Sequence, residues 1–405
     1  MPGKPTALLA VLTSGLALSG CLGGDEPEST RVTGRAATVI ASLPEDGVSA
    51  PAAKAVAAGA RLALADAGGR AGELPVRLVV RSSTEPGEVV WDPDLVSKNA
   101  ERAAEDPSTV AYLGELDYGA SAVSLPITNE ARILQVSPLD GLTSLTRTPP
   151  GRPRSNPVRL RPAERRSFVR LTPTDLLQAE RLLELMREDG VRRMAVLFDQ
   201  EVYGRELAAQ LVARARRDGP APVGDEEYRG DVKEIPGIVR GLAEASPDAV
   251  VYAGVAGPGI GRLLAAIDAR MPGVPVYGTG GLLARDPKVP IPASPDRVRA
   301  LGAVLPDREL GPGARRVVER VEALRGRGAA RPEAVYGYEA MRLALDAVAE
   351  GGRDRERVID AAMRIRERTS PLGALRIRAT GDVEETRFAL YALSDGSFRF
   401  RRVVP

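Results

Sequence analysis

The chain has 405 residues, and its 56 Lys and Arg nearly balance its 54 Asp and Glu, so no global charge favours a nucleic-acid partner. It contains no histidine and one cysteine, which excludes Ser-His-Asp triads, Cys-His nucleophiles and histidine metal sites. An enzyme would have to work with carboxylates, lysine, serine or tyrosine alone.

Residues 1–20 have the three parts of an export signal. Lys4 gives a basic start, residues 7–18 form an apolar run shorter than the about 20 residues that span a bilayer, and two small residues then precede Cys21. The stretch LSGC resembles the bacterial lipobox, which implies cleavage before Cys21 and lipidation of its thiol. An ordinary secretory signal with a chance cysteine is the alternative.

Residues 21–36 are predicted to be a flexible tether, because they lack hydrophobic periodicity and have almost no large apolar side chains. About 370 residues remain from residue 37, too many for one ordinary core, which suggests two domains. No later segment is apolar enough to span a membrane. We therefore expect an extracytoplasmic body that a lipid anchor at Cys21 holds on the cell membrane.

In the first part of the body, β-rich runs alternate with amphipathic segments. This alternation predicts a parallel α/β sheet. The predicted strands are ATVIAS (37–42), RLVVRS (77–82), STVAYLG (108–114) and RILQVS (132–137), and the predicted helices are 51–69, 92–106 and 119–131.

The segment 146–166 is rich in Pro and Arg and has no periodicity, which predicts a solvated loop or crossover. A phosphate or nucleic-acid surface is the alternative. We expect no nucleic-acid partner, because the segment lacks interleaved aromatic residues and the rest of the chain is not basic.

After this loop the alternation restarts. The predicted strands are 192–199, 248–254 and 274–278, and the predicted helices are 174–190, 203–219 and 258–271. Three helices at 313–326, 332–351 and 354–367 follow, and then three short strands at 374–380, 387–393 and 398–404.

These elements predict an α/β fold of two doubly wound parallel-sheet lobes joined by multiple hinge crossovers. The first lobe comprises 37–167 and about 305–370, and the second comprises 168–304 and about 371–405. Ligands of such sheets bind at the carboxyl ends of the strands, so with two facing lobes we expect a ligand between them.

Five segments resemble, in order, the substrate-binding proteins of branched-chain amino acid ABC transporters. They are 111–147, 192–208, 248–264, 275–283 and 336–348. Each segment is weak evidence alone, and the five together are strong, because they cover nearly all of residues 37–370. The resemblance implies a leucine-binding-protein-like member of the type I periplasmic binding proteins, with a small-molecule ligand and an ABC permease as partners.

The stretch YLGELDYGAS places a strand end at Gly114 and a helix start near Gly119. A helix start offers N–H groups and a positive dipole, which suit a ligand carboxylate, although a plain strand–helix turn is the alternative. The ligand-binding residues predicted here are Tyr118, Gly119, Ala120 and Ser121.

The resemblance implies further ligand contacts. In VSPLDGLTSLT, the loop after the next strand faces the same crevice, which implicates Leu139, Gly141 and Thr143. In DQEVYG, a tyrosine at the position of Tyr203 contacts the ligand in the family. A tyrosine that packs on the hinge is the alternative.

The chain departs from the amino-acid-binding pattern at three further candidate positions. The family usually has a hydroxyl residue at Tyr118, an acidic partner for the ligand ammonium near Gly280, and often an aromatic residue near Ala256. A buried, unpaired ammonium costs roughly 2–5 kcal/mol. Asp117 or Asp140 could substitute, so an amino acid, an amide or a carboxylate without an amine all remain open.

We assign no function to two other motifs. GVAGPGIGR resembles a dinucleotide fingerprint, but Arg262 stands at the third required glycine, so we expect no cofactor. Asp199 and Glu201 follow a strand and are predicted to be structural rather than catalytic.

The sequence therefore predicts a solute-binding lipoprotein of an ABC importer, which captures an amino acid or a related small polar ligand by cleft closure. It is not predicted to be an enzyme. The alternatives are a ligand sensor or orphan receptor on the same fold, an enzyme on this scaffold, and a structural lipoprotein with a degenerate cleft.

Overall fold

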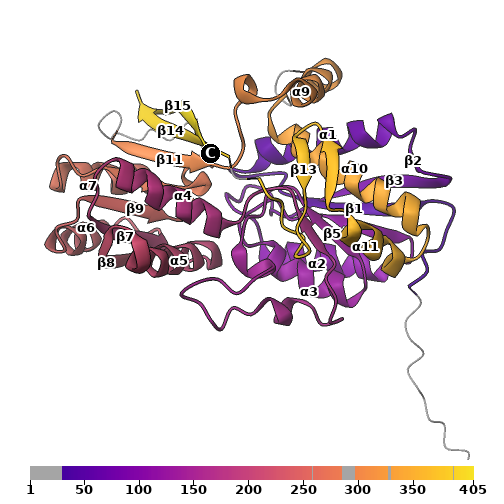
Figure 1. Ribbon diagram of the computed structural model, residues 1–405, viewed down its shortest axis with the longest axis horizontal. Coiled ribbons are helices and arrows are strands. Elements are labelled where there is room, and N and C mark those ends of the chain that lie inside the picture. The colour runs from indigo at the N-terminus through magenta and orange to yellow at the C-terminus, as the bar shows by residue number, and fades with distance from the viewer. Residues whose placement is uncertain (1–29, 258, 285–296, 327–329, 386) are drawn as a thin grey trace, which may run out of the picture.

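The computed structural model describes residues 30–257, 259–284, 297–326, 330–385 and 387–405. These residues form two lobes that lie side by side (Figure 1). Each lobe has a largely parallel sheet with helices on both faces, which confirms the predicted α/β fold. The predicted signal and Cys21 lie outside the described residues. Among the described helices, none has the length and apolar character needed to cross a membrane.

The sheet of the first lobe has the order β2-β3-β1-β4-β5-β6 and is parallel except at β2. Its strands are β1 (Ala37–Leu43), β2 (Arg70–Ala71), β3 (Leu74–Ser82), β4 (Thr109–Leu113), β5 (Leu134–Ser137) and β6 (Phe168–Arg170). Every residue of β1 is buried, as expected of a central strand that is covered on both faces.

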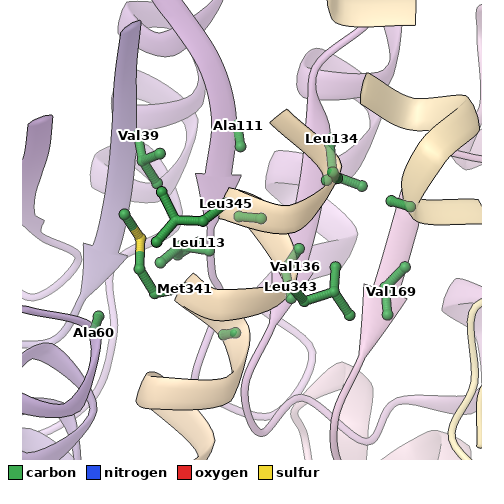
Figure 2. Packing of buried hydrophobic residues seen from close by; sticks show 14 of the residues in the cluster. Val39, Ala60, Ala111, Leu113, Leu134, Val136, Val169, Met341, Leu343 and Leu345 are labelled. Atoms are coloured by element: carbon green, nitrogen blue, oxygen red, sulfur yellow. The ribbon is translucent and has the colours of Figure 1, made fainter. Parts of the chain in front are cut away.

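Five helices cover the two faces of this sheet. Helices α1 (Ala50–Asp66), α10 (Glu333–Gly351) and α11 (Arg355–Arg364) pack on one face, and α2 (Pro93–Glu105) and α3 (Ser121–Glu130) pack on the other. Figure 2 shows Met341 and Leu345 of α10 against Val39 and Leu113 of the central strands. The return of α10 and α11 to the first lobe is therefore part of its core. Helix α9 (Pro312–Arg325) packs on α1 and α10.

The sheet of the second lobe has the order β15-β14-β11-β10-β9-β7-β8, with antiparallel pairing only at β14 and β15. Helices α4 and α5 cover one face, and α6 and α7 cover the other. The strands are β7 (Arg193–Asp199), β8 (Ala221–Tyr228), β9 (Ala249–Ala253), β10 (Val276–Gly278), β11 (Val298–Gly302), β14 (Phe388–Ser394) and β15 (Ser397–Val404). The helices are α4 (Asp175–Glu188), α5 (Val202–Asp218), α6 (Ile235–Glu244), α7 (Ile260–Arg270) and the short α8 (Gly280–Leu283).

Within the described residues, the chain passes between the lobes at three places. The passages follow β6, follow β11, and lie between Val383 and Phe388. The hairpin of β12 (Glu367–Ser370) and β13 (Gly373–Arg376) packs with Val383 into the first-lobe core. We therefore place the last passage later than residue 371, and the first passage after Arg170.

The Arg-rich segment 146–166 lies along the first lobe and contains one short 3-10 turn at Pro157–Leu160. Arg147 forms an ion pair with Asp382 (2.9 Å), and Arg165 forms ion pairs with Asp360 and Glu356. At least two of its arginines are therefore held by carboxylates of the same chain.

Candidate functional site

A cleft of about 1310 Å³ lies between the lobes, where strands of both sheets end. The first lobe lines it with the loops that follow β1, β3, β4 and β5 and with the segment before α10. The second lobe lines it with the start of α4, with α8, with the loop after β11 and with aromatic residues of β14 and β15. The carboxyl ends of parallel strands, at an interface between two lobes, are the usual place for a small-molecule site.

Four of the ten predicted site residues line this cleft, namely Tyr118, Leu139, Gly141 and Gly280. They come from both lobes. The other six lie buried behind the cleft wall, and they are Gly119, Ala120, Ser121, Thr143, Tyr203 and Ala256.

The start of α3 already holds a carboxylate, that of Asp140. This fully buried side chain accepts hydrogen bonds from the backbone N–H groups of Gly119 (3.1 Å), Ser121 (2.9 Å) and Leu142 (3.1 Å). Burial raises the pKa of Asp140, while the three N–H donors and the nearby Arg170 act against that rise. The positive end of the helix, expected to bind a ligand carboxylate, is therefore neutralised from within the chain.

The hydroxyl of Thr143 also has internal partners. It donates to Gln210 Oε1 (3.1 Å) and accepts from the N–H of Leu176 (3.0 Å). The next residue, Ser144, donates its N–H to Glu206 Oε1 (3.0 Å). Because Gln210 and Glu206 belong to α5 and Leu176 to α4, these bonds tie a first-lobe loop to the second lobe beside the cleft.

Tyr203 lies directly behind Tyr118. The two ring centroids are 4.5 Å apart, and the Tyr203 hydroxyl hydrogen-bonds Thr279 Oγ1 at 2.6 Å. Tyr118 lines the cleft, whereas Tyr203 is 1% exposed. Ala256 lies in the second-lobe core, where its N–H donates to the carbonyl of Gly281 (3.0 Å). Tyr203 thus supports the residue that faces the cleft.

Tyr118 and Gly280 depend on each other. A Cβ atom added at Gly280 would lie 2.2 Å from the Tyr118 hydroxyl oxygen, which is far inside contact distance. The tyrosine hydroxyl therefore occupies the space from which an acidic side chain at position 280 would start. The departures from the amino-acid-binding pattern at positions 118 and 280 therefore have one steric cause.

We expect a double-mutant cycle to reveal this arrangement. Gly280→Ala should lower the free energy of unfolding by about 1–3 kcal/mol, because the new methyl group overpacks against the Tyr118 hydroxyl. In a Tyr118→Phe background the same change should cost at least 1 kcal/mol less, because that hydroxyl is gone. Urea unfolding of the four proteins measures the coupling, and equal costs in both backgrounds would refute it.

Two buried carboxyl groups line the cleft beside Tyr118. Asp117 is 9% exposed and Asp175 is 3% exposed. Burial raises the pKa of Asp117 to about 6, against the effect of a hydrogen bond with Ser49. Burial, with Asp140 and Glu206 nearby, raises the pKa of Asp175 well above its ordinary value. The Oδ2 atom of Asp175 makes no hydrogen bond to any described residue.

Asp175 was not predicted as a site residue, because it lies at the start of the predicted helix 174–190, where an acidic residue is ordinary. The structure shows that Thr174 is the cap and accepts a hydrogen bond from the N–H of Leu177. An acidic residue in a first helical turn ordinarily favours the helix dipole and is exposed. The Asp175 carboxyl group instead packs against Gly141, and this contact forms only in the folded chain.

The raised pKa of Asp117 makes folding stability depend on pH. Between its ordinary pKa of 3.8 and its folded value of about 6, the folded chain keeps a proton that the unfolded chain loses, so stability falls as pH rises and stays lower above pH 6. We expect Asp117→Asn to remove this penalty, so the variant should be roughly 2–3 kcal/mol more stable than wild type at pH 7.5. At pH 4 the two should be nearly equal. Denaturant unfolding at both pH values checks this, and a difference independent of pH would contradict it.

The family model described as "Periplasmic binding protein" matches residues 39–397. Solved structures with the same fold include a leucine-binding protein from Thermotoga maritima, with a TM-score of 0.72, 18% identity, and coverage of 91% of this chain and 98% of that chain. A solute-binding protein from R. palustris in complex with 4-hydroxybenzoate has a TM-score of 0.72 and 16% identity, and the match covers 91% and 97%. A branched-chain amino acid transporter substrate-binding protein from Streptococcus pneumoniae in complex with isoleucine has a TM-score of 0.70 and 14% identity, and the match covers 91% and 99%. No curated protein sequence matches the chain.

Proposed function

Because the chain belongs to the periplasmic binding protein family, we propose that it captures one small molecule between its two lobes and presents it to an ABC permease in the membrane. The observation that carries this proposal is the interlobe cleft at the carboxyl ends of both sheets. The three passages between the lobes supply the hinge. A ligand that contacts both walls favours the closed arrangement, which the permease would recognise.

The N-terminal sequence supports an extracytoplasmic location and a lipid anchor at Cys21, which together would keep the body beside the permease. One acyl chain holds a protein only marginally, and two or more hold it firmly. A Cys21→Ala chain should leave the membrane fraction, because it lacks the thiol that carries the lipid. A variant that stays with the membrane would refute the anchor without affecting the proposed ligand site.

We propose no catalytic role. Similar folds are reported with leucine, isoleucine or 4-hydroxybenzoate, and this range of ligands leaves the chemistry of the present ligand to be settled from the cleft itself. The degenerate-cleft alternative gains no support from a cleft of about 1310 Å³, which is larger than most small-molecule pockets.

A thermal-shift panel tests the proposal. The chain from residue 30 onward would be screened with amino acids, amides, aromatic and aliphatic carboxylates, and amines. A compound at 100 times its Kd should stabilise the fold by about 2.7 kcal/mol. No shift with any compound would favour a structural role.

Two alanines, one in α1 and one just after it, allow the location of binding to be tested with a matched control. Ala52 lines the cleft, so Ala52→Trp should fill part of the cleft and abolish the shift. Ala67, just after the same helix, is exposed and does not line the cleft, so Ala67→Trp should keep the shift. A shift that survives in Ala52→Trp would place binding elsewhere.

A further inference from the structure

At the start of α3 and the end of β5, the groups predicted to receive a ligand carboxylate already have partners within the chain. The N–H groups of Gly119 and Ser121 donate to Asp140. The hydroxyl of Ser137, at the end of β5, donates to the carbonyl of Glu115 (2.7 Å) and accepts from the N–H of Asp140 (2.9 Å). A carboxylate placed here would have to displace buried hydrogen bonds and approach the buried charge of Asp140.

The charge of the cleft wall also opposes an anion. Among the described lining residues, Arg331 is the one basic side chain, and its guanidinium forms a bidentate pair with Glu333 at 2.9 and 3.2 Å. Six lining residues are acidic, and they are Asp46, Glu88, Asp117, Asp175, Asp307 and Glu333. Four of them, all except Asp117 and Asp175, lie toward the outside or beside Arg331. The two buried ones stand at the base beside Tyr118.

Of the two buried acids that line the cleft, Asp175 is the one with an oxygen that has no hydrogen-bond partner among the described residues. A buried oxygen without a hydrogen bond costs free energy, and Asp175 Oδ2 has no donor among the described residues. Its other oxygen lies 2.5 Å from the position that a Cβ atom on Gly141 would occupy. Gly141 and Asp175 both line the cleft, so the absence of a side chain at Gly141 leaves the Asp175 carboxyl group next to the ligand space. An ammonium group supplies up to three N–H donors and a positive charge.

The rest of the wall indicates the kind of cation. Within the described part of the chain, no three carboxylates lie close enough together to hold a metal ion. Much of the lining is apolar or aromatic, including Leu116, Leu139, Leu305, Phe388, Tyr391 and Phe398. The lining also includes Tyr118, whose ring packs on Tyr203, and aromatic rings attract cations to their faces.

From these contacts we infer that the cleft selects an organic amine that lacks a carboxylate, with its ammonium group at Asp175 and Asp117 and its apolar part against the hydrophobic wall. The inference rests on the proposed function, since it names the ligand class of the same cleft. It assigns Asp175, at the start of α4, as the partner of the ligand ammonium in place of an acidic side chain at position 280.

Matched pairs of compounds test the inference by calorimetric titration of the full-length protein in a mild detergent. Each pair shares one side chain and differs only by the carboxylate: 3-methylbutylamine and leucine, 2-phenylethylamine and phenylalanine, and 1,5-diaminopentane and lysine. We expect at least one amine to bind 10-fold or more tightly than its amino acid. We expect 4-methylpentanoate, which keeps the carboxylate and lacks the amine, to show no heat of binding.

Variants then locate the ammonium. Asp175→Asn and Asp117→Asn should each weaken the best amine at least 10-fold, and Asp218→Asn, the same change at an exposed helix end, should not. If every amino acid equals or exceeds its amine, or if the carboxylate binds best, the amine inference is overturned and solute capture stands. If no compound binds, both proposals fall. The comparison of pairs uses the unaltered protein, so it holds even if a variant fails to fold.

Discussion

Replacing Asp382 with Ala should lower the free energy of unfolding by about 3–5 kcal/mol, because it leaves a fully buried arginine without its counter-charge. Arg170 Nε lies 2.9 Å from Asp382 Oδ1, and these side chains are 0% and 1% exposed. Asp382 also accepts hydrogen bonds from Thr146 (2.8 Å) and Arg147 (2.9 Å). Urea unfolding followed by circular dichroism would measure the loss.

The pair of Arg170 and Asp382 also stabilises a loop beside the cleft. Arg170 ends β6 just before the first passage between lobes, and its guanidinium donates to the carbonyls of Asp140 (3.1 Å) and Leu142 (2.8 Å). It therefore holds the loop whose Asp140 occupies the start of α3. The exposed pair of Arg364 and Glu350 provides the control, since Glu350→Ala should cost less than about 1 kcal/mol. Similar losses of unfolding free energy in both variants would show that the buried pair contributes no more to stability than the exposed pair.

Gly59→Ala and Gly337→Ala should each cost about 3 kcal/mol, at the upper end of the range for overpacking. A Cβ atom at Gly59 of α1 would lie 1.9 Å from the carbonyl oxygen of Ala334, and one at Gly337 of α10 would lie 2.0 Å from that of Val56. Because both contacts are with backbone, the two helices would have to move apart, and with them the start of α1 that lines the cleft.

A glycine in an open helix gives the opposite expectation. Gly237 lies in α6, where no described atom comes within 4 Å of an added Cβ atom, so Gly237→Ala should stabilise the protein by about 0.5 kcal/mol. Chemical denaturation of the three variants tests the sign of each effect. A stabilised Gly59→Ala protein would mean that α1 and α10 are not packed as closely as described.

The alternation of buried strands and amphipathic helices was sufficient to predict the two-lobed fold, and the family was predicted from the five segments that resemble it. Strand β1 is a continuous buried run, and α10 has the apolar spacing of a helix. Each predicted helix and strand has a counterpart in the structure. Strand β8 and helix α6 were not predicted. Strand β8 lies at a sheet edge, and its sequence APVGDEEY has no apolar alternation. Strands β2, β6, β11 and β12 and the short helix α8 were not predicted either.

The ligand chemistry was harder to predict, because it depends on contacts between distant residues. Tyr118 and Gly280 were recognised as departures from the pattern, but their steric dependence arises only when the lobes meet. Asp140 was considered as a possible ammonium partner, yet its oxygens are taken by three backbone N–H groups. The lack of a side chain at Gly141, which leaves room for the Asp175 carboxyl group, is likewise invisible in a linear pattern.

Small-angle X-ray scattering tests most directly whether the lobes close on a ligand in the cleft. The chain from residue 30 onward would be measured alone and with increasing amounts of the compound that gives the largest thermal shift. We predict that the radius of gyration falls and saturates at one molecule per chain, and that Ala52→Trp prevents the fall. Stabilisation without any compaction would contradict the account, because a ligand would then bind without drawing the two lobes together.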